Sequence, residues 1–173
     1  PLIYVSLGTV VKSKKRFFLS CLDAFREEDV DVILATGSRF CYCRTENIPE
    51  NIHIYEFVPQ TEVLKQADVF VTHGGMNSIS EAFTYGVPMV VIPFMSDQPV
   101  NAKRVVELGL GKQLCHSKLD KAVLKQTVFA VLNDSDMKQK LLLMQKRILE
   151  APGNVGGAEM IIEYGENSGR VPV

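Results

Sequence analysis

Short runs of apolar residues alternate along the chain with segments in which apolar residues recur every three or four positions. The continuous runs are typical of buried strands, and the wider spacing is typical of amphipathic helices. Strands are expected at residues 2–7, 30–35, 53–57, 69–72, 89–92 and 112–115. Helices are expected at residues 14–26, 62–66, 80–85, 100–108, 119–132, 137–149 and 157–164. Alternating strands and helices predict an α/β fold with a doubly wound, Rossmann-like parallel sheet.

Local signals support several of these elements. The first helix carries Phe18, Cys21, Leu22 and Phe25 on one face, and Ser13 is available to cap it. Gly86 and Pro88 end the helix at 80–85. The polar cluster at 133–136 separates two long helices and offers caps for the second.

Composition bounds the class of protein. A length of 173 residues predicts one domain, residues 1–173, without internal repeats. A hydrophobic content of 46% excludes disorder, and 19 basic against 20 acidic residues give no basic field for nucleic acid or a membrane surface. No apolar run reaches the length of about 18 residues that a membrane span needs. We therefore expect a cytoplasmic protein with no nucleic-acid partner, and the start at Pro1 favours a piece of a longer chain.

The cysteines and histidines do not predict a metal or redox site. Cys41 and Cys43 form a C-x-C pair without a second pair, and Cys21 falls on the apolar face of a helix. The three histidines lack the spacing of zinc ligands. Reduced, structural cysteines are expected.

Small, hydroxylated, amide or histidine residues follow five of the expected strands. Because ligands of open parallel sheets bind beyond the carboxyl ends of the strands, these turns locate the expected site. They lie at residues 6–9, 36–39, 57–60, 73–78 and 93–98.

The turn at 73–78 has the most chemical options. Gly74 and Gly75 allow close approach of a ligand to the backbone, and their amides lead into a helix N-terminus that favours anions. His73 adds a donor or a positive charge, and Asn77 adds a neutral donor. Together they suit a diphosphate. An alternative needs no ligand, because Ser78 and Glu81 have the spacing of a capping box.

Two further positions are ambiguous when taken alone. Phe57 could stack on a base or belong to the core. Asp97 and Gln98 could bind a ligand or act as an N-cap pair before the next helix. Their combination with the turn at 73–78 favours a ligand site.

These residues, in this order, resemble the donor-binding half of GT-B glycosyltransferases, specifically the UDP-glycosyltransferase superfamily. The signature runs from Phe57-Val58-Pro59-Gln60 through His73-Gly74-Gly75-Met76-Asn77-Ser78 and Glu81 to Gly86-Val87-Pro88, Pro93 and Asp97-Gln98, and Ser6-Leu7-Gly8-Thr9 is similar to the S-x-G-[ST] turn of that superfamily. Among subfamilies the chain is most similar to the bacterial macrolide-type enzymes. Plant members usually have Trp where Phe57 stands.

The resemblance implies a role for each position. Phe57 would stack on uracil, while the Val58 backbone and Gln60 hold the base and ribose, and Glu81 accepts hydrogen bonds from the ribose hydroxyls. The diphosphate would be bound by Gly8, Thr9, His73, Gly75, Asn77 and Ser78. Asp97 and Gln98 would hold the sugar, with a preference for glucose.

The resemblance also implies an inverting transfer without a metal cofactor. His73 and the helix N-terminus would stabilise the charge that develops on the leaving diphosphate. Two D-x-D sequences, at 29–31 and 134–136, match the metal-binding pattern of the other major glycosyltransferase fold. The first is expected at the amino end of a strand and the second in the capping cluster, so neither is expected to bind metal.

In the resembled family a separate N-terminal domain holds the small lipophilic acceptor and the general base. Neither His53, at the wrong sheet edge, nor His116, in a solvent-facing turn, is a credible base here. We therefore expect this chain to bind a UDP-sugar and to be inactive in transfer by itself. The alternatives are a non-catalytic subunit that assembles with a separate acceptor-binding chain, a sugar-nucleotide epimerase and a generic flavodoxin-like module.

Overall fold

The computed structural model describes residues 1–8, 15–37 and 48–168. The predicted cap Ser13, the predicted phosphate ligand Thr9 and the pair Cys41 and Cys43 lie outside these residues.

Within the described residues the strands form one six-stranded parallel sheet in the order β3-β2-β1-β4-β5-β6. The strands are β1 (Leu2–Ser6), β2 (Asp31–Ala35), β3 (Ile52–Tyr55), β4 (Val69–Thr72), β5 (Met89–Val91) and β6 (Gly111–Gln113). The helices are α1 (Lys15–Phe25), α2 (Gln60–Leu64), α3 (Met76–Tyr85), α4 (Gln98–Glu107), η1 (His116–Lys118), α5 (Lys121–Leu132), α6 (Ser135–Leu149) and α7 (Gly153–Ser168). The predicted doubly wound α/β fold is confirmed.

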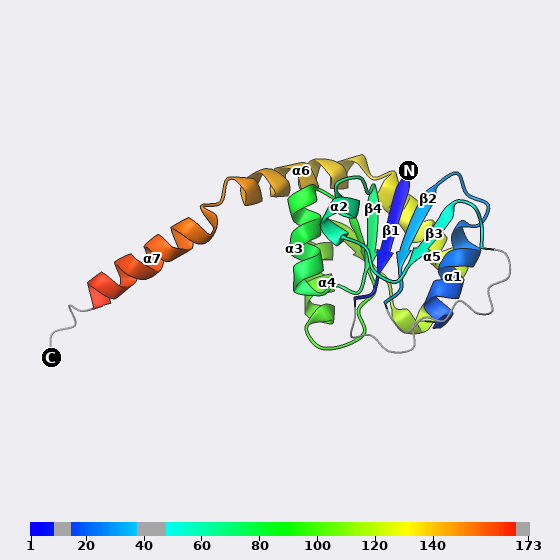
Figure 1. The fold of residues 1–173 in the computed structure, drawn as a ribbon, viewed down its shortest axis with the longest axis horizontal. Coiled ribbons are helices and arrows are strands. Elements are labelled where there is room, and N and C mark those ends of the chain that lie inside the picture. The colour runs from blue at the N-terminus through cyan, green and yellow to red at the C-terminus, as the bar shows by residue number, and fades with distance from the viewer. Residues whose placement is uncertain (9–14, 38–47, 169–173) are drawn as a thin grey trace.

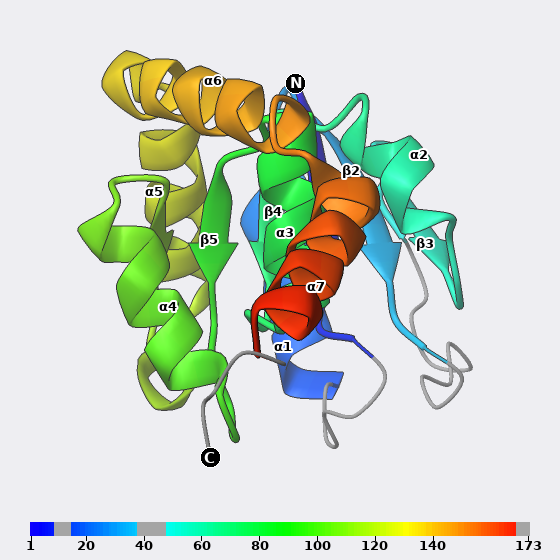
Figure 2. The same ribbon diagram turned by 90° about the vertical axis from the view of Figure 1, so that its left-hand side faces the viewer.

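Helices cover the sheet on both faces. Figures 1 and 2 show α2 and α3 on one face and α1 and α5 on the other. Helix α4 packs beside β6, and α6 packs across the end of α3. Because α1 follows β1 and α3 follows β4, the chain leaves these neighbouring strands toward opposite faces. Ligands of doubly wound sheets bind at this kind of switch point.

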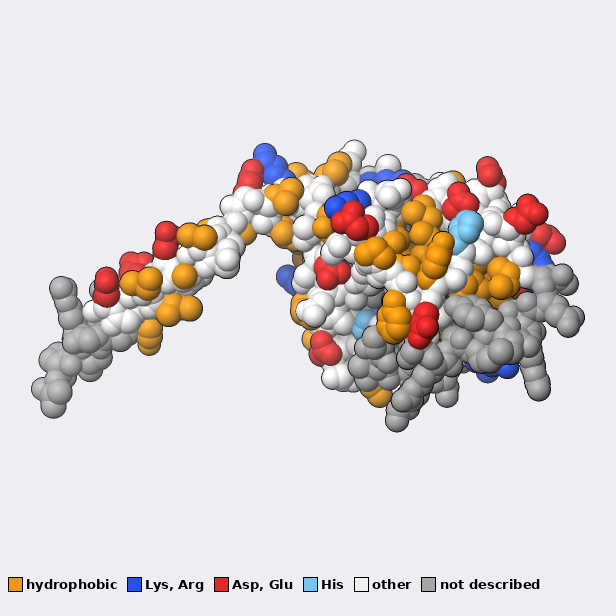
Figure 3. All heavy atoms as spheres, viewed as in Figure 1, with side chains coloured by type: hydrophobic (Ala, Val, Ile, Leu, Met, Phe, Trp, Pro, Cys, Tyr) orange, Lys and Arg blue, Asp and Glu red, His pale blue; other side chains and the backbone are white. Residues whose placement is uncertain are grey.

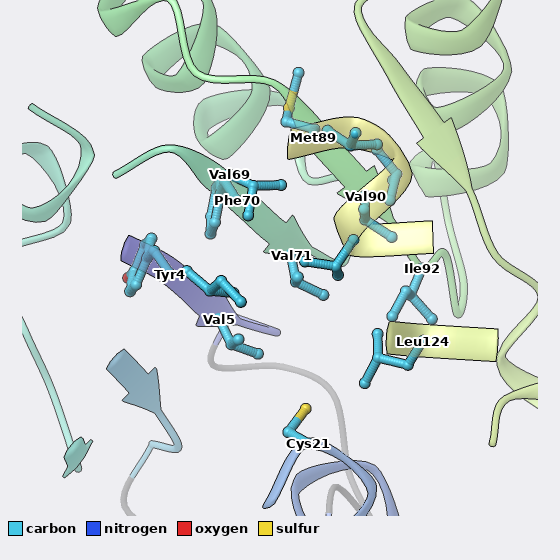
Figure 4. Close-up of a cluster of buried hydrophobic side chains, with 14 of the residues drawn as sticks. Tyr4, Val5, Cys21, Val69, Phe70, Val71, Met89, Val90, Ile92 and Leu124 are labelled. Carbon is cyan, nitrogen blue, oxygen red and sulfur yellow. The ribbon is translucent and has the colours of Figure 1, made fainter. Parts of the chain in front are cut away.

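The core is built from the apolar runs that the sequence shows. Every residue of β4 and β5 is buried, as expected for central strands covered on both faces, whereas the edge strand β3 has exposed positions. Figure 4 shows side chains of β1, β4 and β5 meeting Cys21 of α1 and Leu124 of α5. The predicted core positions of α1 are confirmed, including Cys21, where burial raises the pKa of the thiol and keeps it protonated.

Helices α1, α2, α4, α5 and α6 lie within two residues of their predicted bounds, whereas α3 and α7 extend further. Helix α3 begins at Met76 instead of residue 80, and α4 begins at Gln98 instead of residue 100. The periodic apolar pattern marks only the part of a helix that faces the core, and these first turns carry polar residues at the sheet edge. Helix α7 spans Gly153–Ser168, longer than the predicted 157–164, because internal glycines cost only about 1 kcal/mol each.

Helix α7 extends away from the sheet (Figure 1). Its apolar side chains, among them Met160, Ile161 and Tyr164, are exposed, and Figure 3 shows apolar atoms along this projecting helix. Among the described residues, none of the helices combines the length and apolar character that crossing a membrane requires.

Candidate functional site

The ring of His73 lies between two glycines that are far apart in the sequence. A Cβ on Gly8 would lie 2.8 Å from His73 Cε1, and a Cβ on Gly75 would lie 2.6 Å from His73 Nε2. Gly8 also has a φ of +65°, which side chains rarely adopt. The turns after β1 and β4 therefore meet at the switch point, and both glycines are required for His73 to occupy this position.

The backbone of Gly74 is hydrogen-bonded to two side chains from neighbouring elements. Its amide donates to Thr72 Oγ1 at 3.3 Å, and its carbonyl accepts from Asn101 Nδ2 at 3.0 Å. Both partners are buried. A Cβ on Gly74 would lie 2.6 Å from Val91 Cγ1, and φ is +85°. The turn is thus fixed to β4, β5 and α4.

Gly75 is the N-cap of α3, with φ −64° and ψ 143° and no side-chain cap. Ser78 lies within the first turn of the helix, so the interpretation of Ser78 and Glu81 as a capping box is wrong. Gly75, three residues before Ser78, occupies the N-cap position instead. The N-terminal amides and the positive end of the helix dipole lie next to His73.

Gln60, Ser78 and Glu81 form one hydrogen-bonded cluster with a residue of β1. Gln60 Nε2 donates to Glu81 Oε2 at 2.6 Å and lies 3.3 Å from Ser78 Oγ. Gln60 Oε1 accepts from the Tyr4 hydroxyl at 3.1 Å. Three predicted site residues are therefore brought together, and Tyr4 joins them.

Phe57 lies after β3 at the same edge of the sheet, with 61% of its surface exposed. Its interpretation as a core residue is wrong, because the strand ends at Tyr55 and the loop carries Phe57 outward. Val58 is half-buried and packs against the core. An exposed aromatic ring beside a packed neighbour leaves a flat apolar surface open to a ligand.

Asp97 and Gln98 hold the loop between β5 and α4. The buried Gln98 side chain accepts from the amides of Phe94 at 2.9 Å and Met95 at 3.2 Å. Asp97 occupies the N-cap position of α4, but its carboxylate makes no cap and accepts from Asn101 Nδ2 at 2.8 Å. Asp97 therefore has the predicted N-cap position, but neither Asp97 nor Gln98 caps the helix through its side chain.

His53 and the aspartates of the two D-x-D sequences lie at the positions that the sequence predicts. His53 lies 3.8 Å from Asp31 at the amino ends of β2 and β3, away from the site. Asp134 caps α6 through the amide of Met137, and Asp136 pairs with Lys140. Neither D-x-D sequence is part of a metal-binding group in the described ranges.

His116 is exposed, but its surroundings were not predicted. Its Nδ1 lies 3.2 Å from the carbonyl of Pro93, and its ring stacks on Phe94 at 5.1 Å. It therefore packs against the loop that carries Asp97 and Gln98.

Residues 20–163 match the model of one protein family, the erythromycin biosynthesis protein CIII-like C-terminal domain. The chain belongs to this family. It is 43% identical over 159 residues to the NDP-glycosyltransferase YjiC of Bacillus subtilis, covering 92% of this chain and 40% of that protein. It is 33% identical to the demethyllactenocin mycarosyltransferase of Streptomyces fradiae, over 93% of this chain and 35% of that enzyme.

Solved structures agree with this assignment. The calicheamicin glycosyltransferase CalG4 superposes with a TM-score of 0.89 at 31% identity, over 99% of this chain and 44% of that chain. The glycosyltransferase of kitacinnamycin superposes with a TM-score of 0.88 at 33% identity, over 92% and 42%. The fold of this CIII-like domain is that of the C-terminal portion of GT-B glycosyltransferases, and the domain spans about two-fifths of its relatives.

Sequence reasoning missed three residues of the CIII-like domain whose side chains hydrogen-bond to residues of the candidate site. They are Tyr4, Thr72 and Asn101. Two of them leave a detectable signal. Tyr4 is the polar-tipped residue inside an aliphatic strand, and Asn101 lies one helical turn after Asp97, where their side chains share a face. Nothing in the sequence distinguishes Thr72 from other strand threonines.

Proposed function

We propose that this chain is the donor-binding half of a glycosyltransferase and binds a UDP-sugar, with UDP-glucose as the favoured donor. The observation that carries the proposal is the His73 ring between Gly8 and Gly75, beside the uncapped N-terminus of α3. This arrangement combines the hydrogen-bond donor of the His73 ring, the amides of the glycine turn and the positive end of a helix dipole. Together these groups suit a diphosphate. The glycosyltransferase names of its relatives support the same conclusion.

The remaining site residues would recognise the other parts of the donor. The exposed Phe57 ring would stack on uracil beside the Val58 backbone. Glu81, held by Gln60, would accept hydrogen bonds from the ribose hydroxyls. Gly8, Thr9, Asn77 and Ser78 would complete the diphosphate site with His73 and Gly75. Asp97 and Gln98 would hold the sugar, since their loop lies beside the Gly74 turn through Asn101.

The proposed chemistry is an inverting displacement at the anomeric carbon of the sugar, without a metal cofactor. Negative charge develops on the leaving diphosphate as the bond to the sugar breaks. Donors that are already fixed in place stabilise this charge without reorganisation during the reaction. His73 and the first amides of α3 would provide that stabilisation.

The acceptor, expected to be small and lipophilic, and the general base would come from the portion of the relatives that this chain does not span. Removal of a general base typically lowers a rate by about 10²–10⁴-fold. The chain alone is therefore expected to bind the UDP-sugar and to transfer the sugar very slowly.

Calorimetric titration of the chain with UDP, dTDP and UDP-glucose, with and without Mg²⁺, tests the proposal. For each of UDP and UDP-glucose, we expect the same affinity in the presence and in the absence of Mg²⁺. His73→Ala should weaken UDP by about tenfold and leave uridine nearly unchanged, because hydrogen bonds to charged groups contribute about 1.5–3 kcal/mol. Absence of nucleotide binding would overturn the site assignment, and equal losses for UDP and uridine would contradict the role of His73.

A further inference from the structure

Tyr4 places a single polar atom beneath the candidate ribose site. It lies in the middle of β1 between the buried residues Ile3 and Val5. Its ring stacks on Phe70 of β4 with centroids 4.7 Å apart and planes 10° apart, and the two residues are register partners in the sheet. Figure 4 shows them side by side on neighbouring strands. The ring is therefore fixed by the sheet, and its hydroxyl has a fixed position.

The Tyr4 hydroxyl holds one end of the Gln60 side chain. It donates to Gln60 Oε1 at 3.1 Å, while Gln60 Nε2 donates to Glu81 Oε2 at 2.6 Å. An ionised carboxylate can only accept hydrogen bonds, so the amide cannot turn over without placing two acceptors against each other. Tyr4 satisfies the oxygen that this orientation directs toward the sheet.

The hydroxyl keeps its proton over the working range of pH. Burial raises the pKa of Tyr4 to about 12, with the Glu81 carboxylate adding to the rise and the Ser6 hydroxyl opposing it. The donor of the Tyr4–Gln60 hydrogen bond is thus present at every pH at which the nucleotide would be bound.

We propose that Tyr4 is a positioning residue that sets the preference of this site for ribose over 2′-deoxyribose. The inference rests on the proposed function, since it takes Glu81 as the acceptor for the ribose hydroxyls. The relay from Tyr4 through Gln60 occupies Glu81 Oε2 and restricts the rotation of the carboxylate, so that its other oxygen is left to accept from the ribose hydroxyls. Tyr4 itself does not contact the nucleotide.

The test compares UDP with 2′-deoxy-UDP by calorimetry in the wild-type chain and in Tyr4→Phe, which keeps the ring and removes only the hydroxyl. We expect the wild type to prefer UDP by about tenfold, as for one hydrogen bond to a charged group. In Tyr4→Phe the preference should fall to about two- to threefold, through weaker UDP binding with little change for 2′-deoxy-UDP. In a Glu81→Ala background, adding Tyr4→Phe should change the preference no further.

Tyr85→Phe is the matched control, because Tyr85 lies at the far end of α3, and it should retain the wild-type preference. Should Tyr4→Phe fail to fold by circular dichroism, Gln60→Leu removes the Tyr4–Gln60 and Gln60–Glu81 hydrogen bonds together and must lose the preference. A wild-type preference retained in a folded Tyr4→Phe chain would overturn the inference alone. A wild-type chain that binds neither nucleotide would overturn the proposed function instead.

Discussion

The side-chain amide of Asn101 joins two turns of the site by donating to the carbonyl oxygen of Gly74 at 3.0 Å and to Asp97 Oδ2 at 2.8 Å. One buried residue of α4 thus connects the turn proposed for the diphosphate with the carboxylate proposed for the sugar.

Replacing Asn101 with Ala should lower the free energy of unfolding by about 1–3 kcal/mol, because the buried Gly74 carbonyl loses its side-chain donor. Urea denaturation followed by circular dichroism measures the change. Asn154→Ala, at an exposed position of α7, is the control and should stay within about 0.5 kcal/mol of the wild type. A loss for Asn101→Ala no larger than the control would contradict the role of this contact.

Replacing Gly75 with Ala should displace His73 and leave the backbone unstrained. The φ of −64° at Gly75 suits any residue, but the new Cβ would come within 2.6 Å of His73 Nε2. We expect affinity for UDP to fall by about tenfold, the loss expected for one hydrogen bond to a charged group, with uridine unaffected. Calorimetry with both ligands measures this.

Gly157→Ala is the matched control for Gly75→Ala, since a Cβ there has open space. It should leave both affinities at the wild-type values. Undiminished UDP binding by Gly75→Ala would show that the position of the His73 ring is irrelevant to the diphosphate.

Replacing Gln98 with Ala should loosen the loop between β5 and α4, because the amides of Phe94 and Met95 lose their common acceptor. If this loop holds the sugar, affinity for UDP-glucose should fall severalfold while affinity for UDP changes little. Titration with both ligands separates the two effects.

Gln98→Glu keeps an oxygen for the two amides and should retain most of the thermal stability that Gln98→Ala loses. Gln139→Ala, at an exposed position of α6, controls for the loss of a glutamine side chain. Equal losses for UDP and UDP-glucose in Gln98→Ala would rule out a sugar-specific role for the loop.

The stability of the chain should fall between pH 10 and pH 12 in part because of Tyr4. Its pKa is raised from 10.0 to about 12 in the folded chain, so over this interval the unfolded chain releases a proton that the folded chain retains. The contribution is therefore fully present below pH 10 and is lost as pH rises toward 12, by about 2–3 kcal/mol. Guanidinium denaturation across this range measures it.

Because other groups titrate in the same interval, the difference between the wild type and Tyr4→Phe isolates this term. The wild type should lose more stability than Tyr4→Phe from pH 10 to pH 12. Parallel losses in the two proteins would show that the Tyr4 hydroxyl is not buried as the structure has it.

The sequence predicts the strands and the core face of a helix better than it predicts the polar turns of the candidate site. The strands were predicted to within about two residues because buried central strands require continuous apolar runs, as in β4. The helical period of α1 predicted four of its buried residues and missed Phe17 and Ala24, which lie beside them on the same face. The first turns of α3 and α4 were missed, because polar residues at a site carry no apolar period.

The sequence by itself determined the fold class and the resemblance to a nucleotide-sugar binding family, and it selected the sheet edge at which the candidate site is proposed. These follow from local patterns, which short-range sterics and burial dictate. Only the tertiary structure decided that Gly8 meets His73, that Tyr4 supports Gln60 and that Asn101 supports Gly74. Such contacts depend on strand order and on the crossing of the chain between faces of the sheet, which bring together residues whose separation in sequence carries no period.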